Sequence, residues 1–482
     1  MLSLLRGNSA LVPPNTKRVK FERCSVDDWC MKLDTVRSPV RLTWIAAAFG
    51  CAASALAATI GADARWLAAL GDAIVRAGAV PHALPYAGAP QAAWHDASAL
   101  GQLVFYGLES QLGDRGLVLA QTAAAAIALG ALALDMQRAH VRDRAGAGVL
   151  VAIVIAAPAA FFVVRAQLFS LALFPVLVLL LRSEAERPSR RIWLAVPLLA
   201  LWANLHGGVL VGFAALASYL VLRRLRVAVL GTIAVLAASA CALVATPAFI
   251  DTVRYYAGVL GGEAAATHYG LWAPLSLRDP LDLLFIALAL PLVLTALRRR
   301  PATWELVVLV ALSASAIESR RSGIWLLLFV APPAALGLQR AAAGRPFLSR
   351  RLALVCGCVP ALMLVFGLVR APASNGAGER LIRQAAAAAH RTPILAEPLD
   401  AERLALEGHR IWIGNPLDAF PRADQRLYLD WLRGAPAGDR ILQAPVRVVL
   451  VTRGSAPQLL LSRTAAFREI GHDAHAVLYG RN

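Results

Sequence analysis

Long apolar blocks alternate with short arginine-rich segments along most of the chain. A helix that crosses a bilayer needs about 20 mainly apolar residues, so these blocks predict a protein with many membrane spans. We expect eleven spans, although several blocks are short and ten or twelve would also fit. The blocks cover residues 43–60, 116–134, 146–164, 167–181, 192–205, 207–222, 227–245, 281–297, 304–317, 323–338 and 352–369.

Composition agrees with this interpretation. Of 482 residues, 58% are hydrophobic and 16% are charged, which excludes a soluble enzyme and a disordered protein. The six cysteines lie in the N-terminal segment or inside apolar blocks, so neither a disulfide framework nor a metal cluster is expected. Cys356 and Cys358 have no second cysteine pair or histidine beside them, which argues against zinc.

The charges predict an orientation in the membrane. Lys and Arg total 48 against 30 Asp and Glu, and they gather at the ends of the apolar blocks. This placement favours anionic lipid headgroups over nucleic acid as the partner. With a cytosolic N-terminus, the cytosolic segments carry 25 Lys and Arg, and the opposite loops carry 8. We therefore expect residues 1–42 to be a basic cytosolic tail. The outer loops 61–115 and 246–280 and the terminal domain 370–482 would lie on the extracytoplasmic face.

Residues 370–482 have a different pattern. Short apolar runs at 393–396, 410–413, 446–451 and 476–479 predict strands, and the segments 400–407, 423–433 and 456–468 predict helices. The fold class expected for the whole chain is thus an all-α polytopic membrane domain, residues 43–369, followed by a small α/β domain. Trp412 and Trp431 could stack on a sugar in that domain or belong to its core.

Asp63 follows directly after the first apolar block, where a carboxylate at the membrane boundary could act as a general base. It could equally be a solvated aspartate at a helix start. Arg165, Arg320 and Arg321 lie at span ends expected at the same depth, and guanidinium groups bind phosphate in a bidentate manner. Such arginines also simply anchor helix ends. Further candidates at this depth are Asp96, Trp66, Trp94, Gln167, Asn204, His206, Trp272 and Glu318.

Four of these segments together resemble a bacterial family of multi-span proteins in the GT-C glycosyltransferase superfamily. They are the stretch from Asp63 to Trp94, Arg-Ala-Gln-Leu-Phe-Ser at 165–170, Trp-Ala-Asn-Leu-His-Gly-Gly at 202–208 and the Arg-Arg pair at 320–321. The resemblance covers roughly residues 43–340. It extends more loosely to residues 412–420.

The resemblance implies an enzyme that transfers a sugar from a polyprenyl-phosphate carrier to a glycan, lipid or protein acceptor outside the cytoplasm. It implies that Asp63 is the catalytic base in a single inverting displacement, and that Arg165, Arg320 and Arg321 stabilise the leaving phosphate. No cofactor or metal is expected. Neither the oligomeric state nor the identity of the sugar and acceptor follows from the sequence.

The chain departs from the family where relatives carry a glutamate, at Ser98. Asp96 could replace that carboxylate. The alternative is a catalytically inactive membrane scaffold or glycan-binding protein that keeps the fold. A transporter is disfavoured because the apolar blocks are nearly free of charge, whereas transporters place charges near the midplane.

Overall fold

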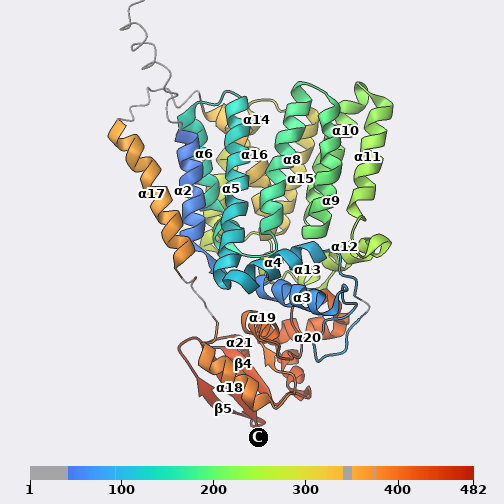
Figure 1. The fold of residues 1–482 in the computed structure, drawn as a ribbon, viewed down its shortest axis with the longest axis vertical. Helices are drawn as coiled ribbons and strands as arrows, with labels where there is room; N and C mark the ends of the chain where they lie inside the picture. Colours follow the sequence, from blue (N-terminus) through green and yellow to red (C-terminus); the bar gives the residue numbers. More distant parts are fainter. Residues whose placement is uncertain (1–41, 93, 340–349, 371, 373–375) are drawn as a thin grey trace, which may run out of the picture. The chain divides into compact units, whose positions relative to one another are not determined.

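The computed structural model describes residues 42–482 except 93, 340–349, 371 and 373–375, with backbone only for residues 350–357. The expected cytosolic tail therefore lies outside the described residues, apart from Leu42. Residues 42–339 and 350–369 form a bundle of helices, and residues 379–481 form a smaller domain built around a sheet (Figure 1).

Each of the eleven apolar blocks contains a helix. These helices are α2 (Leu42–Ala57), α5 (Asp114–Arg138), α6 (Asp143–Ala156), α8 (Leu168–Glu186), α9 (Ala195–Leu205), α10 (Val209–Leu222), α11 (Val229–Leu243), α14 (Pro280–Leu297), α15 (Thr303–Glu318), α16 (Gly323–Leu338) and α17 (Arg350–Val369). Large apolar side chains such as Leu230, Leu362 and Phe366 face outward with more than 60% of their surface exposed. An apolar exterior of this kind is stable in lipid rather than in water.

Helix length bears on the number of spans. Among the described helices, four stretches are long and apolar enough to cross a bilayer: residues 114–138, 168–186, 280–297 and 320–338. The apolar helices at 42–57, 229–243 and 358–369 are shorter. The count of eleven spans thus stays a prediction.

The expected helix over residues 146–164 is wrong in its second half. Helix α6 ends at Ala156, because Pro158 has no N–H to continue the hydrogen-bond ladder. A short helix, α7 (Pro158–Phe162), follows and leads into strand β2 (Val163–Val164). Strand β2 pairs in parallel with β1 (Thr59–Ile60), which follows α2. Two chain segments about 100 residues apart are thereby joined at one end of the bundle.

The two long loops, residues 61–115 and 246–280, contain shorter helices. The first loop forms α3 (Ala64–Ala77) and α4 (Ala99–Leu112), which pack against each other. The second forms α12 (Thr252–Leu260) and α13 (Glu263–Ala266). Further turns of 3-10 helix lie at 190–194, 224–226, 249–251, 270–272, 320–322, 417–419 and 436–443.

The C-terminal domain has a mixed four-stranded sheet in the order β3 (Leu395–Ala396), β4 (Val448–Thr452), β6 (Ala476–Arg481), β5 (Phe467–His472). Strand β3 is parallel to β4, and the other pairs are antiparallel. Its helices are α18 (Glu379–Ala389), α19 (Pro398–Leu406), α20 (Arg422–Arg433) and α21 (Ala456–Leu461). Trp431 is fully buried and stacks on Tyr428, so it belongs to the core. Trp412 is partly buried against that core.

Two expectations for this domain need correction. The helix expected over 456–468 ends at Leu461, and Phe467–His472 is an edge strand. Its side chains are largely exposed and polar, so the segment lacks the apolar pattern from which a strand is predicted. Residues 410–413 form isolated bridges instead of a full strand, with Ile411 bridging both Ile394 and Ala87.

The bridge to Ala87 ties the loop 61–115 to the C-terminal domain. The Gly88 N–H donates to the Ile411 carbonyl (2.7 Å), and the Ile411 N–H donates to the Tyr86 carbonyl (2.8 Å). A side chain at position 88 would collide with Pro393, so glycine is required there. We call residues 86–92 the strap. Helices α3 and α19 also pack against each other beside it.

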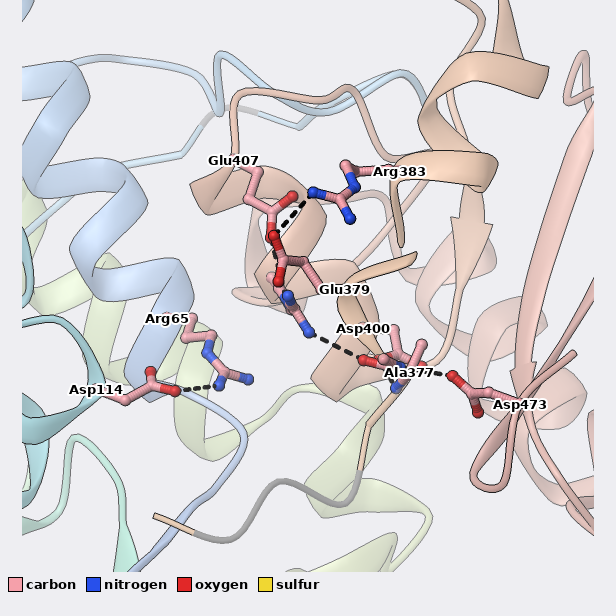
Figure 2. Close-up of polar contacts among 10 residues, drawn as sticks. Arg65, Asp114, Ala377, Glu379, Arg383, Asp400, Glu407 and Asp473 are labelled. Atoms are coloured by element: carbon pink, nitrogen blue, oxygen red, sulfur yellow. Dashed lines mark hydrogen bonds and ion pairs between the residues drawn. The ribbon is translucent and has the colours of Figure 1, made fainter. Parts of the chain in front are cut away.

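Figure 2 shows polar contacts on either side of this junction, within the helical region and within the C-terminal domain. Arg65 of α3 donates to Asp114 at the start of α5 (2.9 Å), so its charge is paired within the helical region. In the C-terminal domain, Asp400 accepts the Ala377 N–H (2.8 Å). The helical region and the C-terminal domain thus meet along α3, α19 and the strap.

Candidate functional site

The short parallel pair β1–β2 places Asp63 beside Arg165. The Gly61 N–H donates to the Val164 carbonyl (3.1 Å), which continues the pairing by one residue. A side chain at position 61 would collide with Val163, so only glycine allows this close approach. One Arg165 guanidinium nitrogen lies 3.5 Å from Asp63 Oδ2. Two residues expected to work together are therefore neighbours.

Asp63 itself has an unusual backbone conformation. Its φ of 88° is left-handed, a region that non-glycine residues adopt at a cost of about 1–2 kcal/mol. Its N–H donates to both carboxyl oxygens of Glu402 in α19, at 2.9 Å each. Asp63 Oδ1 accepts longer hydrogen bonds from Asn415 (3.3 Å) and from the Trp66 indole (3.4 Å). About a third of the Asp63 side chain remains exposed.

Three adjoining cavities lie in this part of the structure, with volumes of about 200, 570 and 220 Å³. His206, Trp272 and Arg321 line all three. Asp63 lines the two smaller ones, and Arg165 with Gln167 lines the 220 Å³ cavity. Thus Asp63, Arg165 and Arg321 face one connected region.

Arg321 is held in place by the residues around it. Its guanidinium lies 4.2 Å from the centre of the Trp272 ring, a distance typical of a cation–π contact. The Gln167 amide donates to the Arg321 carbonyl (3.1 Å). The guanidinium is thus held where its nitrogens can donate hydrogen bonds to a ligand that enters the cavity.

His206 caps α9, and its tautomer follows from its partners. Nδ1 accepts the Gly208 N–H (3.1 Å) and lies 2.6 Å from the Ser170 hydroxyl, which accepts from the Trp202 indole. Burial and the neighbouring Arg321 charge lower the pKa of His206 to about 3, so the ring is neutral at physiological pH. The proton must then be on Nε2. His206 contributes a neutral hydrogen-bond donor to the site.

The largest cavity has a different lining. Its apolar residues include Leu210, Val211, Val259, Leu260 and Trp325, which come from α10, α12 and α16. Glu318 lies in this cavity. Trp66 and Trp94 instead line the 200 Å³ cavity near Asp63. The larger space is therefore mainly apolar and reaches toward the helical bundle.

The structure places Arg320 apart from its neighbour. Its guanidinium binds Asp279 (2.7 Å) and Asp282 (2.9 Å), and it does not line the three cavities. It lines another, mostly apolar cavity of about 130 Å³, which Arg321 and Gln167 also line. Because two carboxylates neutralise it, Arg320 is not available as the third phosphate ligand that the sequence suggests.

Asn204 differs from expectation, whereas Asp96 lines a cavity that Asp63 also lines. Asn204 donates to the Ala200 and Ala245 carbonyls (2.8 and 2.7 Å) and does not line these cavities, so its contacts join α9 to the end of α11. Asp96 lines the 200 Å³ cavity, but its side chain is buried, and Oδ1 accepts from Ser98 and Gln102. Burial raises the pKa of Asp96 to about 6. Asp63 lines the same cavity, and Asp96 Oδ2 has no hydrogen-bond partner among the described residues, so Asp96 stays a candidate for a second carboxylate.

Sequence reasoning missed the residues supplied by the C-terminal domain. Asn415 lies in the segment 412–420 that resembles the family only loosely, so a weak signal existed. Glu402 sits in an ordinary amphipathic helix, and nothing in its local sequence marks it. Within the described residues, no group of three or more His, Cys, Asp and Glu side chains is placed to hold a metal ion. The expectation of metal-free chemistry stays a prediction.

Comparisons with known proteins identify the fold. No family model matches the sequence, and no curated protein matches it. The structure resembles ArnT from Cupriavidus metallidurans bound to undecaprenyl phosphate, with a TM-score of 0.51 and 14% identity over 94% of this chain and 98% of that one. The apo form of the same protein gives 0.51 and 13% over the same shares. This likeness shows that the two chains share an overall fold.

Proposed function

We propose that this protein is a membrane glycosyltransferase that moves a sugar from a polyprenyl-phosphate carrier to an acceptor on the extracytoplasmic side. The observation that carries the proposal is the placement of Asp63 and Arg165 on the wall of a cavity shared with Arg321 and His206. A base, two phosphate-binding cations and a neutral donor are the groups that such a transfer needs. The likeness to a structure that holds undecaprenyl phosphate supports the same chemistry.

In this proposal Asp63 takes the proton from the acceptor hydroxyl. The hydroxyl oxygen then attacks the anomeric carbon, the bond from that carbon to the phosphate oxygen breaks, and the configuration inverts. The contacts of Asp63 to Arg165, Asn415 and Trp66 are all 3.3 Å or longer. A carboxylate has about four acceptor positions, so one remains for the incoming hydroxyl.

Arg165 and Arg321 stabilise the charge that develops on the leaving phosphate. Each guanidinium can form charge-assisted bonds to phosphate oxygens, and the His206 Nε2–H can add a third donor. The apolar 570 Å³ cavity, which shares Arg321 and His206, suits the first prenyl units of the carrier. The lipid would then approach sideways from the bilayer with its phosphate at the membrane boundary.

The proposed setting is the bacterial inner membrane, with a cytosolic N-terminus and the C-terminal domain outside. The excess of Lys and Arg in the expected cytosolic segments supports this orientation. In this orientation Asp63 and the three cavities lie at the outer end of the bundle. The acceptor, whether a glycan, a lipid or a protein, would then come from the extracytoplasmic side.

The decisive experiment measures turnover by the full chain in lipid nanodiscs. Wild-type protein would be given undecaprenyl-phosphate-linked glucose, galactose, mannose and arabinose with a bacterial envelope extract as acceptor, and release of undecaprenyl phosphate would be followed by mass spectrometry. Asp63→Asn should abolish release. Asp72→Asn is the matched control, because Asp72 lies on the same helix and pairs with exposed Arg76.

Full activity of Asp63→Asn would contradict the assignment of the base. A wild-type protein that binds undecaprenyl phosphate but releases none from any donor would favour the inactive scaffold instead. The Ser98 position, where relatives carry a carboxylate, is the feature that supports this alternative.

A further inference from the structure

The contact between Glu402 and Asp63 crosses from the C-terminal domain to the helical region. Both Glu402 oxygens accept the Asp63 N–H at 2.9 Å, although the two residues are 339 positions apart. Glu402 is 1% exposed. Among the hydrogen-bond partners described for Asp63, Glu402 is the one whose side chain accepts a hydrogen bond from the Asp63 main chain.

Asn415 links the same two residues from their side chains. Its Nδ2 donates to Glu402 Oε1 (2.9 Å) and to Asp63 Oδ1 (3.3 Å). Asp63, Glu402 and Asn415 therefore form a closed triangle of hydrogen bonds. The main chain and the side chain of Asp63 are both fixed by the C-terminal domain.

This support matters because of the backbone of Asp63. At φ 88° and ψ −21°, the residue is left-handed, and the next residue begins α3. Without a compensating contact, rotation to φ < 0 would relieve the strain and turn the carboxylate away from Arg165. A buried acceptor on the Asp63 N–H opposes that rotation.

We propose that Glu402 is a positioning residue for Asp63, so that the C-terminal domain acts in the reaction by holding the base toward Arg165 and the cavity. This inference rests on the proposed function. Glu402 does not touch the cavity contents: it is absent from the lining of all three cavities. Its effect must therefore pass through Asp63.

The protonation state of Glu402 fits this role. Burial and the Asp63 charge raise the pKa of Glu402 to about 8, so it is mainly neutral at pH 7. The other charged or titratable groups that interact with it are Arg65, which favours the carboxylate, and Tyr86 and Tyr428. Arg65 is itself paired with Asp114. Ionisation above pH 8 would place a second negative charge beside Asp63.

The test combines Glu402→Ala, Glu402→Gln and the control Glu407→Gln in the full chain in nanodiscs. Glutamine keeps an acceptor oxygen for the Asp63 N–H and for Asn415, and it cannot ionise. Glu407 lies at the end of the same helix and pairs with Arg403. Two readouts are needed: hydrogen–deuterium exchange of the peptide that contains residues 61–66, and kcat and KM for release of undecaprenyl phosphate.

We expect Glu402→Ala to speed exchange at Asp63 and to lower kcat about 10- to 100-fold with little change in KM, as for a misplaced catalytic group. Glu402→Gln should restore both values at pH 7. It should also remove the fall in kcat that we expect for the wild type above pH 8. Glu407→Gln should behave as wild type. Rescue by glutamine and the lost alkaline limb would not be expected from a merely structural residue.

Unchanged exchange in Glu402→Ala would overturn the positioning role, as would faster exchange with unchanged kcat. If Glu402→Ala does not fold, Glu402→Gln decides the question through its pH profile, and an alkaline limb identical to wild type would refute the proposal. Inactivity of the wild type with every donor would instead reject the proposed function and, with it, this role. Because that outcome is measured on the wild type alone, it is distinguished from a failure of the positioning role without any Glu402 variant.

Discussion

Arg165 lies 3.5 Å from Asp63 although 102 residues separate them in the chain. The link between them is the parallel β1–β2 pair, which is only two residues long on each side. Such a short pair is stable here because Gly61 extends it, because α5 packs against both strands and because α7 contacts β2. The geometry of the site thus depends on a few backbone hydrogen bonds at the ends of helices.

Replacing Arg165 with Gln should lower transfer without unfolding the protein. The variant keeps a polar side chain beside Asp63 but removes the charge expected to stabilise the leaving phosphate. Hydrogen bonds to charged groups contribute about 1.5–3 kcal/mol, so kcat should fall roughly 10- to 100-fold. Steady-state release of undecaprenyl phosphate measures this. A variant with wild-type kcat would remove Arg165 from the proposed mechanism.

The adjacent residues Arg320 and Arg321 should respond differently to mutation. Arg321→Gln should weaken binding of undecaprenyl phosphate roughly 10- to 100-fold, because its guanidinium faces the cavities. Arg320→Gln should chiefly lower the melting temperature, because it leaves Asp279 and the buried Asp282 without their cation. Native mass spectrometry and thermal unfolding separate the two effects.

Arg254→Gln is the control for that pair, since Arg254 is three-quarters exposed and pairs only with nearby Asp251 among its described partners. It should change neither quantity. Equal losses of lipid binding in the Arg320 and Arg321 variants would mean that both bind phosphate, as the sequence alone suggests.

Stability should fall as pH rises from about 4 to 8. Burial raises the pKa of Asp96, Asp400 and Asp418 to about 6 and that of Glu402 to about 8. The folded state then binds more protons than the unfolded state between pH 4 and 8, so the free energy of unfolding decreases with pH over this window. Melting temperatures across the range measure the slope.

Asp400→Asn provides an internal check on that slope. Its amide oxygen can still accept the Ala377 N–H, but the side chain no longer titrates. The decrease between pH 5 and 7 should therefore become smaller. A steeper decrease, or a melting temperature that rises with pH in the wild type, would show that other groups dominate the linkage.

Gly88→Ala should destabilise the contact between the strap and the C-terminal domain. The added methyl would collide with Pro393 beside the Gly88–Ile411 hydrogen bond. Overpacking of this kind costs about 1–3 kcal/mol, and faster exchange of the amides at 410–412 should accompany it. Gly107→Ala is a matched control in α4, where an added methyl meets open space. A neutral Gly88→Ala would mean that the strap yields easily.

The parts of the site that were predictable from sequence are those at the ends of apolar helices. Asp63, Arg165, His206 and Arg321 stand out because polar groups next to long apolar blocks must share one depth in the membrane. Their convergence follows from that shared depth, and in the structure all four line the 220 Å³ cavity.

The remaining features depend on tertiary contacts that no local pattern records. Arg320 and Arg321 are adjacent residues of the same type, so the sequence does not distinguish them. In the structure the Arg320 side chain contacts Asp279, whereas the Arg321 side chain contacts Trp272. Glu402 was hidden because its partner is a backbone N–H far away in the chain. Strand β5 was hidden because an exposed edge strand lacks an apolar pattern.

The strap has a consequence for protein engineering. Residues 86–92 belong to the first loop but form hydrogen bonds with residues 411–419. The C-terminal domain therefore cannot be exchanged between relatives by replacing only the chain beyond residue 370. A chimaera that takes its C-terminal domain from a relative should also take that relative's strap. Otherwise the contact between the strap and the grafted domain would be mismatched, directly beside the groups proposed to react.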